Sequence, residues 1–256
     1  YINMYTDNCV NFVVHNSSGS EGFTTVFCAQ ASDLGVWQHL VGTYNGSNVR
    51  AYRNGNYITS DSLTGAVYNS DSPLSIGAWD STDSRLNGTV DEVRISNVSR
   101  SADWINQSYR MVANQSTYVS FGAEESRTTW ACSYCDRCRN ITISNAGSST
   151  LTNFPAYINL TKDNDMLSNY QDLRFYGNGC NCGGSVLDYE IENYTASNAH
   201  IWVRIPTLST GNTTISVYYK NNTAVGSGEN ATGVWDSNYV MVQHLEETSG
   251  THNDST

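Results

Sequence analysis

The stretch from residue 36 to residue 55 reads VWQHLVGTYNGSNVRAYRNG and decides how the first part of the chain folds. Apolar and polar side chains alternate within 36–44 and within 49–53, with the period of two that is typical of a strand with one buried face. An Asn-Gly pair follows each run, at positions 45 and 54, and these residue types adopt the positive φ of tight hairpin turns. The stretch therefore predicts consecutive β-hairpins.

Short alternating runs of the same kind continue along the chain, with further Asn-Gly pairs at positions 87 and 178. Helix signals are confined to 101–112, where Ser101 can cap the first turn and Asp103 suits the positive end of the helix dipole. We therefore expect an all-β chain of tandem β-sandwiches, with one short helix near 101–112.

Residues 1–124 resemble the second half of a laminin-G-like, concanavalin-A-like jelly roll. The resemblance rests on the order and spacing of the opening stretch, of Leu74–Gly77 and of Leu86–Ile95. It implies a closing strand at Tyr118–Ala123 and the absence of the family's first strands before residue 1. A sandwich without those strands would expose a sheet edge and an inner face.

Residues 130–225 alternate more regularly than the first segment, and four runs each place apolar side chains on one face. These inward positions are Ile141 and Ile143; Leu187, Tyr189 and Ile191; Ile201, Val203 and Ile205; and Ile215, Val217 and Tyr219. With 172–175 and 199–206, they resemble a β-sandwich domain of unknown function that occurs beside laminin-G-like domains in bacterial and archaeal surface proteins. This resemblance implies no activity, because neither a fold nor the domains found next to it determine a protein's function.

Polar stretches without apolar periodicity predict linkers at 125–129 and 226–233. The tail, 234–256, resembles the first strand of a further laminin-G-like domain. Two interpretations stay open: the chain is a piece of a longer tandem array, or the tail of one copy is a donor segment that completes a neighbouring subunit. The array is favoured, because one strand cannot replace the several that are missing.

The composition indicates an extracellular protein. Ser, Thr and Asn make up 86 of 256 residues, whereas charged residues make up only 14%. Asn-x-Ser/Thr sequons are about twice as frequent as this composition gives by chance, which favours N-linked glycans, although Asn-rich β-proteins also generate sequons as a by-product. The sequons lie at Asn16, Asn45, Asn87, Asn97, Asn106, Asn114, Asn140, Asn159, Asn193, Asn212, Asn221, Asn230 and Asn253.

The seven cysteines point to the same oxidising compartment. Cys9 and Cys28 flank a hairpin whose turn lies near 17–22, and this placement predicts a cross-strand disulfide. The other five cluster with metal-like spacing, at Cys132, Cys135, Cys138, Cys180 and Cys182. Two disulfides are favoured over a zinc site, because five thiols are one too many for a closed four-sulfur site. Their connectivity stays open, and the leftover thiol is a candidate for a bond to a neighbouring subunit.

A metal site is a further hypothesis. The apolar phase along 86–95 shifts by one residue, which predicts a β-bulge at Asp91-Glu92. The laminin-G-like resemblance implies that Asp91 helps to hold a structural Ca²⁺ with an acidic residue near a domain's first strand, and Asp254 is that candidate for a following domain. In the alternative interpretation, Asp91 accepts hydrogen bonds from backbone amides.

Trp202 and Tyr218 are expected on the outward face of the second domain. Such rings could stack on a sugar or pack against a partner. Ordinary cross-strand pairing on a half-solvated sheet is the favoured interpretation. The polar residues expected beside them are Asp188, Glu190, Glu192, His200, Arg204 and Lys220.

Several function classes are disfavoured. With a net charge of −11 and two lysines, the chain has no basic stripe for phosphates, so nucleic acid and anionic membrane surfaces are not expected as partners. No apolar run reaches the roughly 20 residues that span a bilayer, so no membrane insertion is expected. The sequence has no His-Glu-x-x-His pair, Gly-x-Ser-x-Gly elbow or phosphate-binding glycine loop, so we expect neither an enzyme nor an organic cofactor.

The leading hypothesis is a non-enzymatic structural or adhesive subunit of an extracellular glycoprotein assembly at a cell surface, such as a filament, sheath or stalk of bacterial or archaeal origin. Its expected partners are copies of itself or adjacent domains of the same chain. The alternative hypothesis is a glycan-binding, lectin-like module of a secreted adhesin or hydrolase.

Overall fold

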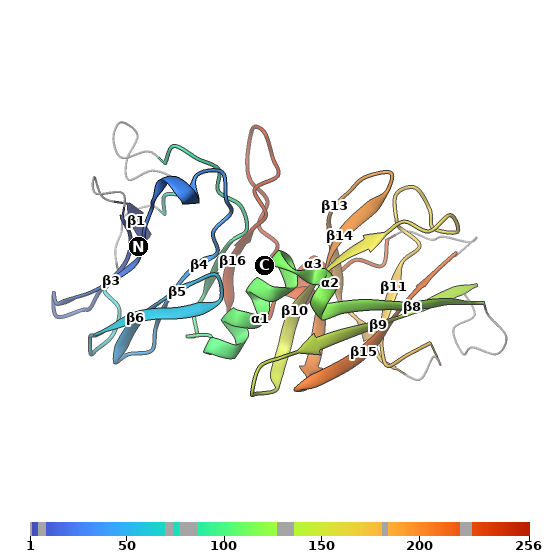
Figure 1. Ribbon diagram of the computed structural model, residues 1–256, viewed down its shortest axis with the longest axis horizontal. Helices are drawn as coiled ribbons and strands as arrows, with labels where there is room; N and C mark the ends of the chain where they lie inside the picture. Colours follow the sequence, from blue (N-terminus) through green and yellow to red (C-terminus); the bar gives the residue numbers. More distant parts are fainter. Residues whose placement is uncertain are drawn as a thin grey trace. The chain divides into compact units, whose positions relative to one another are not determined.

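The computed structural model describes residues 2–4, 9–69, 74–76, 86–126, 136–180, 184–220 and 227–256. The chain divides into two compact units (Figure 1), one of Tyr1–Tyr109 with Leu245–His252 and one of Arg110–His244 with Asn253–Thr256. Both are built mainly from antiparallel strands, which confirms the all-β prediction. Among the described residues, no helix has the length and apolar character required to cross a bilayer.

The first unit contains two three-stranded antiparallel sheets. In spatial order, one consists of β1 (Ile2–Met4), β2 (Cys9–His15) and β3 (Glu21–Cys28). The other consists of β4 (Leu40–Tyr44), β5 (Asn48–Arg53) and β6 (Asn56–Ser62). The unit also holds the 3₁₀ helix η1 (Ala31–Asp33) and the strand β7 (Val93–Ser96).

The hairpins of the opening stretch form where their turns predict them. Gly46 has a φ of 87° between β4 and β5, while Asn54 and Gly55 have φ values of 49° and 75° between β5 and β6. The Asn-Gly pair at position 87 does not make such a turn, since neither residue has a positive φ.

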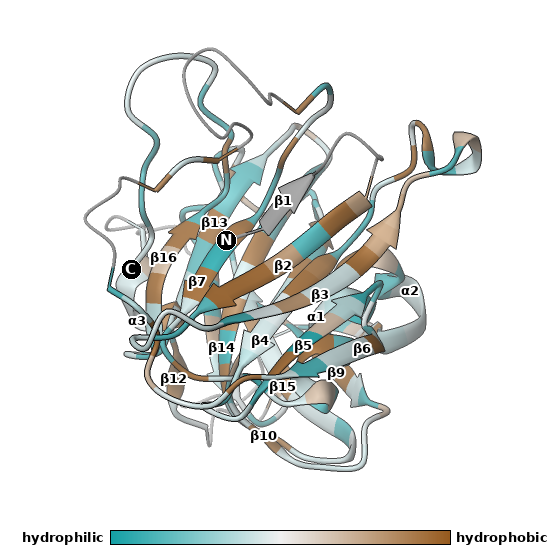
Figure 2. Ribbon diagram, turned by 90° about the vertical axis from the view of Figure 1, so that its left-hand side faces the viewer, coloured by the Kyte–Doolittle hydropathy of each residue, from teal (hydrophilic) through white to brown (hydrophobic). Residues whose placement is uncertain are grey.

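Apolar side chains from both sheets form the core of the first unit. One buried cluster joins Val10 and Val26 to Ala51, and Phe12 packs against it. Figure 2 shows the apolar residues of β2 and β3 in brown. A Cβ on Gly42 would clash with the Phe12 ring, so β4 needs glycine at the point where the ring crosses it.

The predicted disulfide between Cys9 and Cys28 is present. These residues are direct partners in the register of β2 and β3, so the hairpin brings their side chains together, although the register shifts between Val10 and Asn11. The bond closes the open end of the hairpin.

The predicted helix is α1 (Ala102–Ala113). The Ser101 hydroxyl accepts a hydrogen bond from the backbone N–H of Trp104 at 3.2 Å, as an N-cap does. A short helix, α2 (Gln115–Tyr118), follows it.

The strand expected to close the first domain belongs to the second unit. It is β8 (Val119–Ser126), and it pairs with β9 (Arg137–Asn145). Val119 lies opposite Ile143 and Phe121 opposite Ile141, so the apolar residues of β8 extend the second sandwich. The resemblance implies this strand for the first domain, and that prediction is wrong, because similarity in the order of strands does not show which sheet a strand joins.

The second unit is a sandwich of two antiparallel sheets. The larger sheet has, in spatial order, β12 (Val186–Leu187), β11 (Arg174–Gly177), β15 (Gly211–Tyr219), β9 and β8. The smaller sheet has β10 (Leu151–Thr161), β14 (Asn198–Leu208) and β13 (Tyr189–Tyr194). The helix α3 (Ala231–Val234) and the strand β16 (Tyr239–Gln243) come from the tail.

The inward positions predicted for the second sandwich are buried, with one exception. Ile191 is only half-buried, and the register of β13 with β14 shifts between Ile191 and Asn193. The shift interrupts the alternation at that point of the strand. Phe175 and Tyr189 join the two sheets through rings whose centroids lie 5.0 Å apart.

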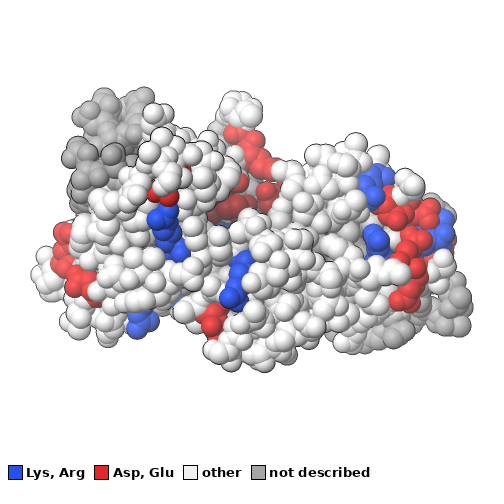
Figure 3. All heavy atoms as spheres, in the orientation of Figure 1, with Lys and Arg blue, Asp and Glu red and all other residues white. Residues whose placement is uncertain are grey.

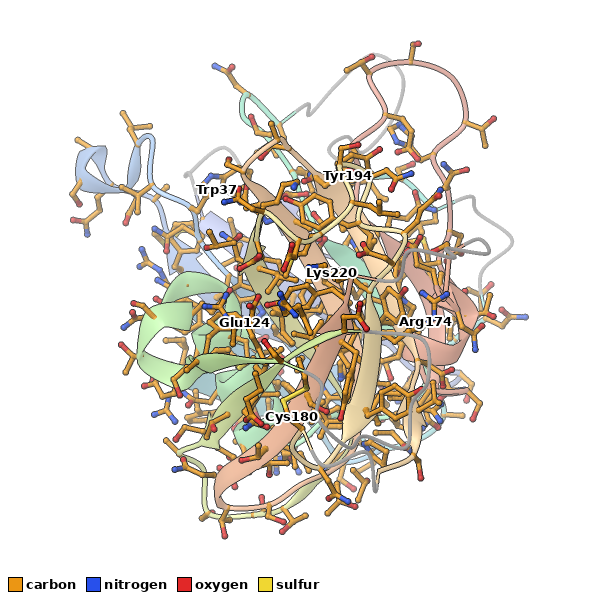
Figure 4. The ribbon with its side chains drawn as sticks, turned by 90° about the vertical axis from the view of Figure 1, so that its right-hand side faces the viewer. Trp37, Glu124, Arg174, Cys180, Tyr194 and Lys220 are labelled. Atoms are coloured by element: carbon orange, nitrogen blue, oxygen red, sulfur yellow. A yellow bond between two sulfur atoms is a disulfide. The ribbon has the colours of Figure 1, made fainter. Side chains whose placement is uncertain are left out.

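A second disulfide joins Cys138 on β9 to Cys180, and both residues are buried. Figure 4 shows its sulfur atoms beside the Cys180 label. Cys132, Cys135 and Cys182 lie outside the described residues, so the remaining connectivity of the cluster stays open.

We expect the second disulfide to contribute more to stability than the first. Cys138 and Cys180 are 42 residues apart, against 19 for Cys9 and Cys28. A longer closed loop removes more entropy from the unfolded chain, so we predict losses of about 4 kcal/mol for C138A/C180A and about 3 kcal/mol for C9A/C28A. Urea unfolding of the two double variants measures both. A larger loss in C9A/C28A would contradict the prediction.

His39 precedes β4 and makes the first unit sensitive to acid. Its backbone N–H donates to Asn54 Oδ1 at 2.9 Å, and its ring lies 5.9 Å from that of Tyr109. Burial, followed by the positive charge of Arg94, lowers the pKa of His39 to about 4.

Because the unfolded chain binds this proton near pH 6.5, the unfolded state takes up more protons than the folded state between about pH 6.5 and pH 4. We therefore predict that the free energy of unfolding falls by up to about 3 kcal/mol across this window, beyond any effect of the carboxyl groups. Urea unfolding at stepped pH should show a smaller loss in His39→Gln, whereas His15→Gln, at a histidine whose side chain is 41% exposed, should behave as the unmodified protein does. Equal pH dependence in all three proteins would contradict the prediction.

Candidate functional site

The outer face of the smaller sheet in the second unit carries one aromatic and acidic row. Tyr157 on β10 and Glu190 on β13 are both register partners of Trp202 on β14, so the three side chains lie side by side. The Tyr157 and Trp202 ring centroids are 5.0 Å apart. Strand alternation turns this row away from the core that Ile201 and Val203 fill.

The tail of the chain covers this row. Val234, Trp235 and Val242 pack with Trp202 in one buried cluster. The Trp202 ring centroid lies 5.5 Å from that of Trp235 and 6.3 Å from that of His244, which is stacked on it. As a result, Trp202 is only 2% exposed although it points outward from the sandwich.

Two carboxylates tie the indoles in place. Trp202 Nε1 donates to Glu192 Oε2 at 2.7 Å, and Trp235 Nε1 donates to Glu190 Oε2 at 2.9 Å. Glu190 also accepts a hydrogen bond from the Ser255 hydroxyl at 2.6 Å, and His244 Nε2 lies 3.4 Å from it. Burial raises the pKa of Glu190, but the bonds from His244, Ser255 and Trp235 outweigh it and hold that pKa below its ordinary value.

Asp254 fixes the last residues of the chain. Its Oδ1 accepts hydrogen bonds from the backbone N–H of Val242 at 3.0 Å and from the backbone N–H and hydroxyl of Thr256 at 3.1 and 2.9 Å. Burial raises the pKa of Asp254, but these bonds lower it below its ordinary value. This carboxylate oxygen therefore already has donors around it, which fits a Ca²⁺ ligand less well than a backbone cap.

Asp91 is exposed and lies in the first unit, two residues before β7 begins. The irregularity predicted there as a β-bulge is a left-handed residue outside the strand, Glu92, with a φ of 56°. Glu92 forms an ion pair with Arg94. The calcium hypothesis for Asp91 and Asp254 stays a prediction.

An open hollow of about 440 Å³ lies beside the tail in the second unit. Trp235 and Tyr239 line it, with ring centroids 5.2 Å apart in an edge-to-face arrangement. Arg204 of β14 and Asp236 add one charge of each sign, and neutral polar residues that include Asn153 complete the lining. Aromatic rings and a few polar groups around a concave surface are typical of sites for small ligands.

The prediction that Trp202 and Tyr218 form an exposed ligand or partner face is wrong, because both are buried. The tail covers Trp202, while Tyr218 packs against the Cys138–Cys180 disulfide and Tyr176. Alternation gave the correct outward direction for both rings. Alternation does not show whether residues from distant segments of the chain pack over an outward side chain and bury it.

A second acidic group lies around β8, β9 and the end of β15. Arg137 Nε lies 2.9 Å from a carboxylate oxygen of both Glu124 and Asp165, and Lys220 Nζ lies 3.1 Å from Asp165. Lys220 first, and then Arg137, lower the pKa of Asp165 despite some burial. In Figure 3 basic and acidic side chains intermix at this end of the unit, and Figure 4 labels Glu124 and Lys220 there. Because cations already face these carboxylates, we interpret the group as an ion-pair network.

Most of the predicted glycosylation sites in the described part of the chain are exposed. The exposed asparagines are Asn45, Asn87, Asn97, Asn114, Asn193, Asn212, Asn230 and Asn253. Three further sites are half-buried, at Asn106, Asn140 and Asn159, and Asn221 lies outside the described residues.

Asn16 is different, because its side chain is buried. Its Nδ2 donates to the Thr64 carbonyl at 2.8 Å, and its Oδ1 accepts hydrogen bonds from Ser18 and Ser20. This carboxamide holds the β2–β3 turn together.

The sequence interpretation missed Trp235, Tyr239 and the carboxylate contacts of Glu190. The Val234-Trp235 pair and the alternation that follows it are visible in the sequence, but the resemblance places them in another domain. Had the tail been placed on the second sandwich, these apolar residues would have required a partner on its outer face.

Two family models match parts of the chain. One, described as the Concanavalin A-like lectin/glucanases superfamily, matches residues 1–106. The other, described as Domain of unknown function (DUF2341), matches residues 169–256. No curated protein and no solved structure matches the chain.

The position of the second match corrects the sequence interpretation. The match runs to the last residue and not from 130 to 225, so the tail falls inside it, and the prediction that a further laminin-G-like domain begins at residue 234 is wrong. The packing of Val234, Trp235 and Val242 on Trp202 is the physical reason. The chain is thus similar to a concanavalin-A-like domain at its start and to a domain of unknown function at its end.

Proposed function

We propose that this chain is a non-catalytic structural or adhesive module of an extracellular glycoprotein assembly. The observation that carries the proposal is the distribution of exposed sequon asparagines, which lie on both units. The two disulfides, one in each unit, support an oxidising compartment. A concanavalin-A-like sandwich is compatible with a structural or a carbohydrate-binding module.

The chemistry of the aromatic and acidic row supports a non-catalytic role. Glu190 and Glu192 are held by indole, hydroxyl and histidine donors, and they brace the tail. A general acid needs a pKa raised toward neutral pH, whereas the pKa of Glu190 is lowered. These carboxylates therefore act best as fixed acceptors.

When the protein is secreted by a host that carries out N-glycosylation, we expect glycans at exposed sites such as Asn45, Asn97 and Asn212. We expect none at Asn16 in the folded protein, because a glycan on its Nδ2 would disrupt the bond to Thr64. Glycopeptide mass spectrometry measures the occupancy. Asn45→Gln should remove one glycan mass and Asn16→Gln should remove none. Full occupancy at Asn16, or bare exposed sites, would contradict this prediction.

The assembly itself is tested on native material. Electron microscopy of the protein purified from the surface of cells that make it should show filaments, sheaths or another regular polymer. Treatment with a glycosidase serves as the control that the particles carry the glycoprotein. A preparation that contains only monodisperse single particles would contradict the proposal.

A further inference from the structure

We propose that the hollow beside Trp235 and Tyr239 binds a neutral oligosaccharide. Its volume of about 440 Å³ falls within the roughly 300–1,000 Å³ of small-ligand sites. This site differs from the face predicted from the sequence, since Trp202 and Tyr218 are buried elsewhere. It also goes beyond the structural role proposed above and does not depend on it.

The lining offers the two kinds of contact that a sugar needs. A pyranose ring presents an apolar C–H face and hydroxyl groups that both donate and accept. Tyr239 supplies half-buried aromatic surface in front of Trp235, which is only 3% exposed and forms the wall behind it. Arg204 supplies donors, Asp236 supplies acceptors and Asn153 supplies both.

The charges of the hollow decide against other ligands. Arg204 Nη2 lies 3.5 Å from Asp188, so its positive charge is already balanced, and Asp236 adds a negative charge. A phosphate or carboxylate ligand would meet this negative charge. An apolar ligand would remove water from Arg204 and Asp236 and offer no hydrogen bonds in return. A neutral polar ligand avoids both costs.

The walls of the hollow are held in place before any ligand arrives. Trp235 Nε1 is bonded to Glu190, and Asp236 Oδ1 accepts a hydrogen bond from the backbone N–H of Asn238 at 3.0 Å. The Tyr239 backbone N–H in turn donates to the Asp236 carbonyl at 2.9 Å. Such preorganisation reduces the ordering cost of binding.

The test uses the full chain on an array of neutral and acidic glycans, followed by calorimetry with the neutral oligosaccharide that binds best. We expect binding by at least one neutral oligosaccharide, and about tenfold weaker binding in Arg204→Gln and in Asp236→Asn. Arg50→Gln and Asp61→Asn, matched substitutions in the first unit, should bind as the unmodified protein does.

Thermal unfolding and near-UV circular dichroism confirm that each variant is folded. Asp236→Asn keeps an oxygen for the Asn238 N–H, so it decides the matter if Arg204→Gln is unstable. The proposal is overturned by an array without neutral binders, by binding of acidic glycans alone, or by equal affinity in the hollow variants and the controls. Each of these results leaves the microscopy test of the assembly unaffected.

Discussion

The contact of the tail with Trp202 is the constraint on which the second unit depends. An outward Trp on a half-solvated sheet leaves a large apolar surface in water unless something covers it. Here Trp235 and Val242 cover it, and the indole N–H groups find their acceptors in Glu192 and Glu190. The tail supplies both the apolar cover and the donors Trp235 and Ser255 that bond to Glu190, so both kinds of contact fix its position.

This arrangement changes what the outer face of the smaller sheet can do. The row formed by Tyr157, Trp202 and Glu190 is internal, and the surface open to solvent is made by the tail that lies over it. Any recognition on this side therefore depends on residues of the tail such as Tyr239 and Asp236, which follow the helix α3. The carboxylates of Glu190 and Glu192 lie beneath that surface and hold the indoles of Trp235 and Trp202 in place.

Local patterns were sufficient for the features that local physics determines. The cross-strand disulfide at Cys9 and Cys28, the Ser101 cap and the buried face of β14 and β15 follow from turn chemistry, helix capping and alternation. The strand β8 and the tail could not be assigned in this way, because their partners are chosen by packing between distant residues. For the same reason, strand alternation predicts the direction of Trp202 and Tyr218 correctly and their exposure wrongly.

The buried carboxamide of Asn16 links folding to secretion. Enzymes that attach glycans need an accessible side chain, and the turn that sequesters Asn16 forms when the β2–β3 hairpin meets residues 64–67, where Thr64 supplies its carbonyl and Val67 pairs with Asn16. Domains can fold as units while synthesis of the chain continues. Sugar attachment at this asparagine and closure of its turn thus exclude each other. An Asn16 without a glycan therefore marks a molecule in which the turn closed before a sugar could be attached.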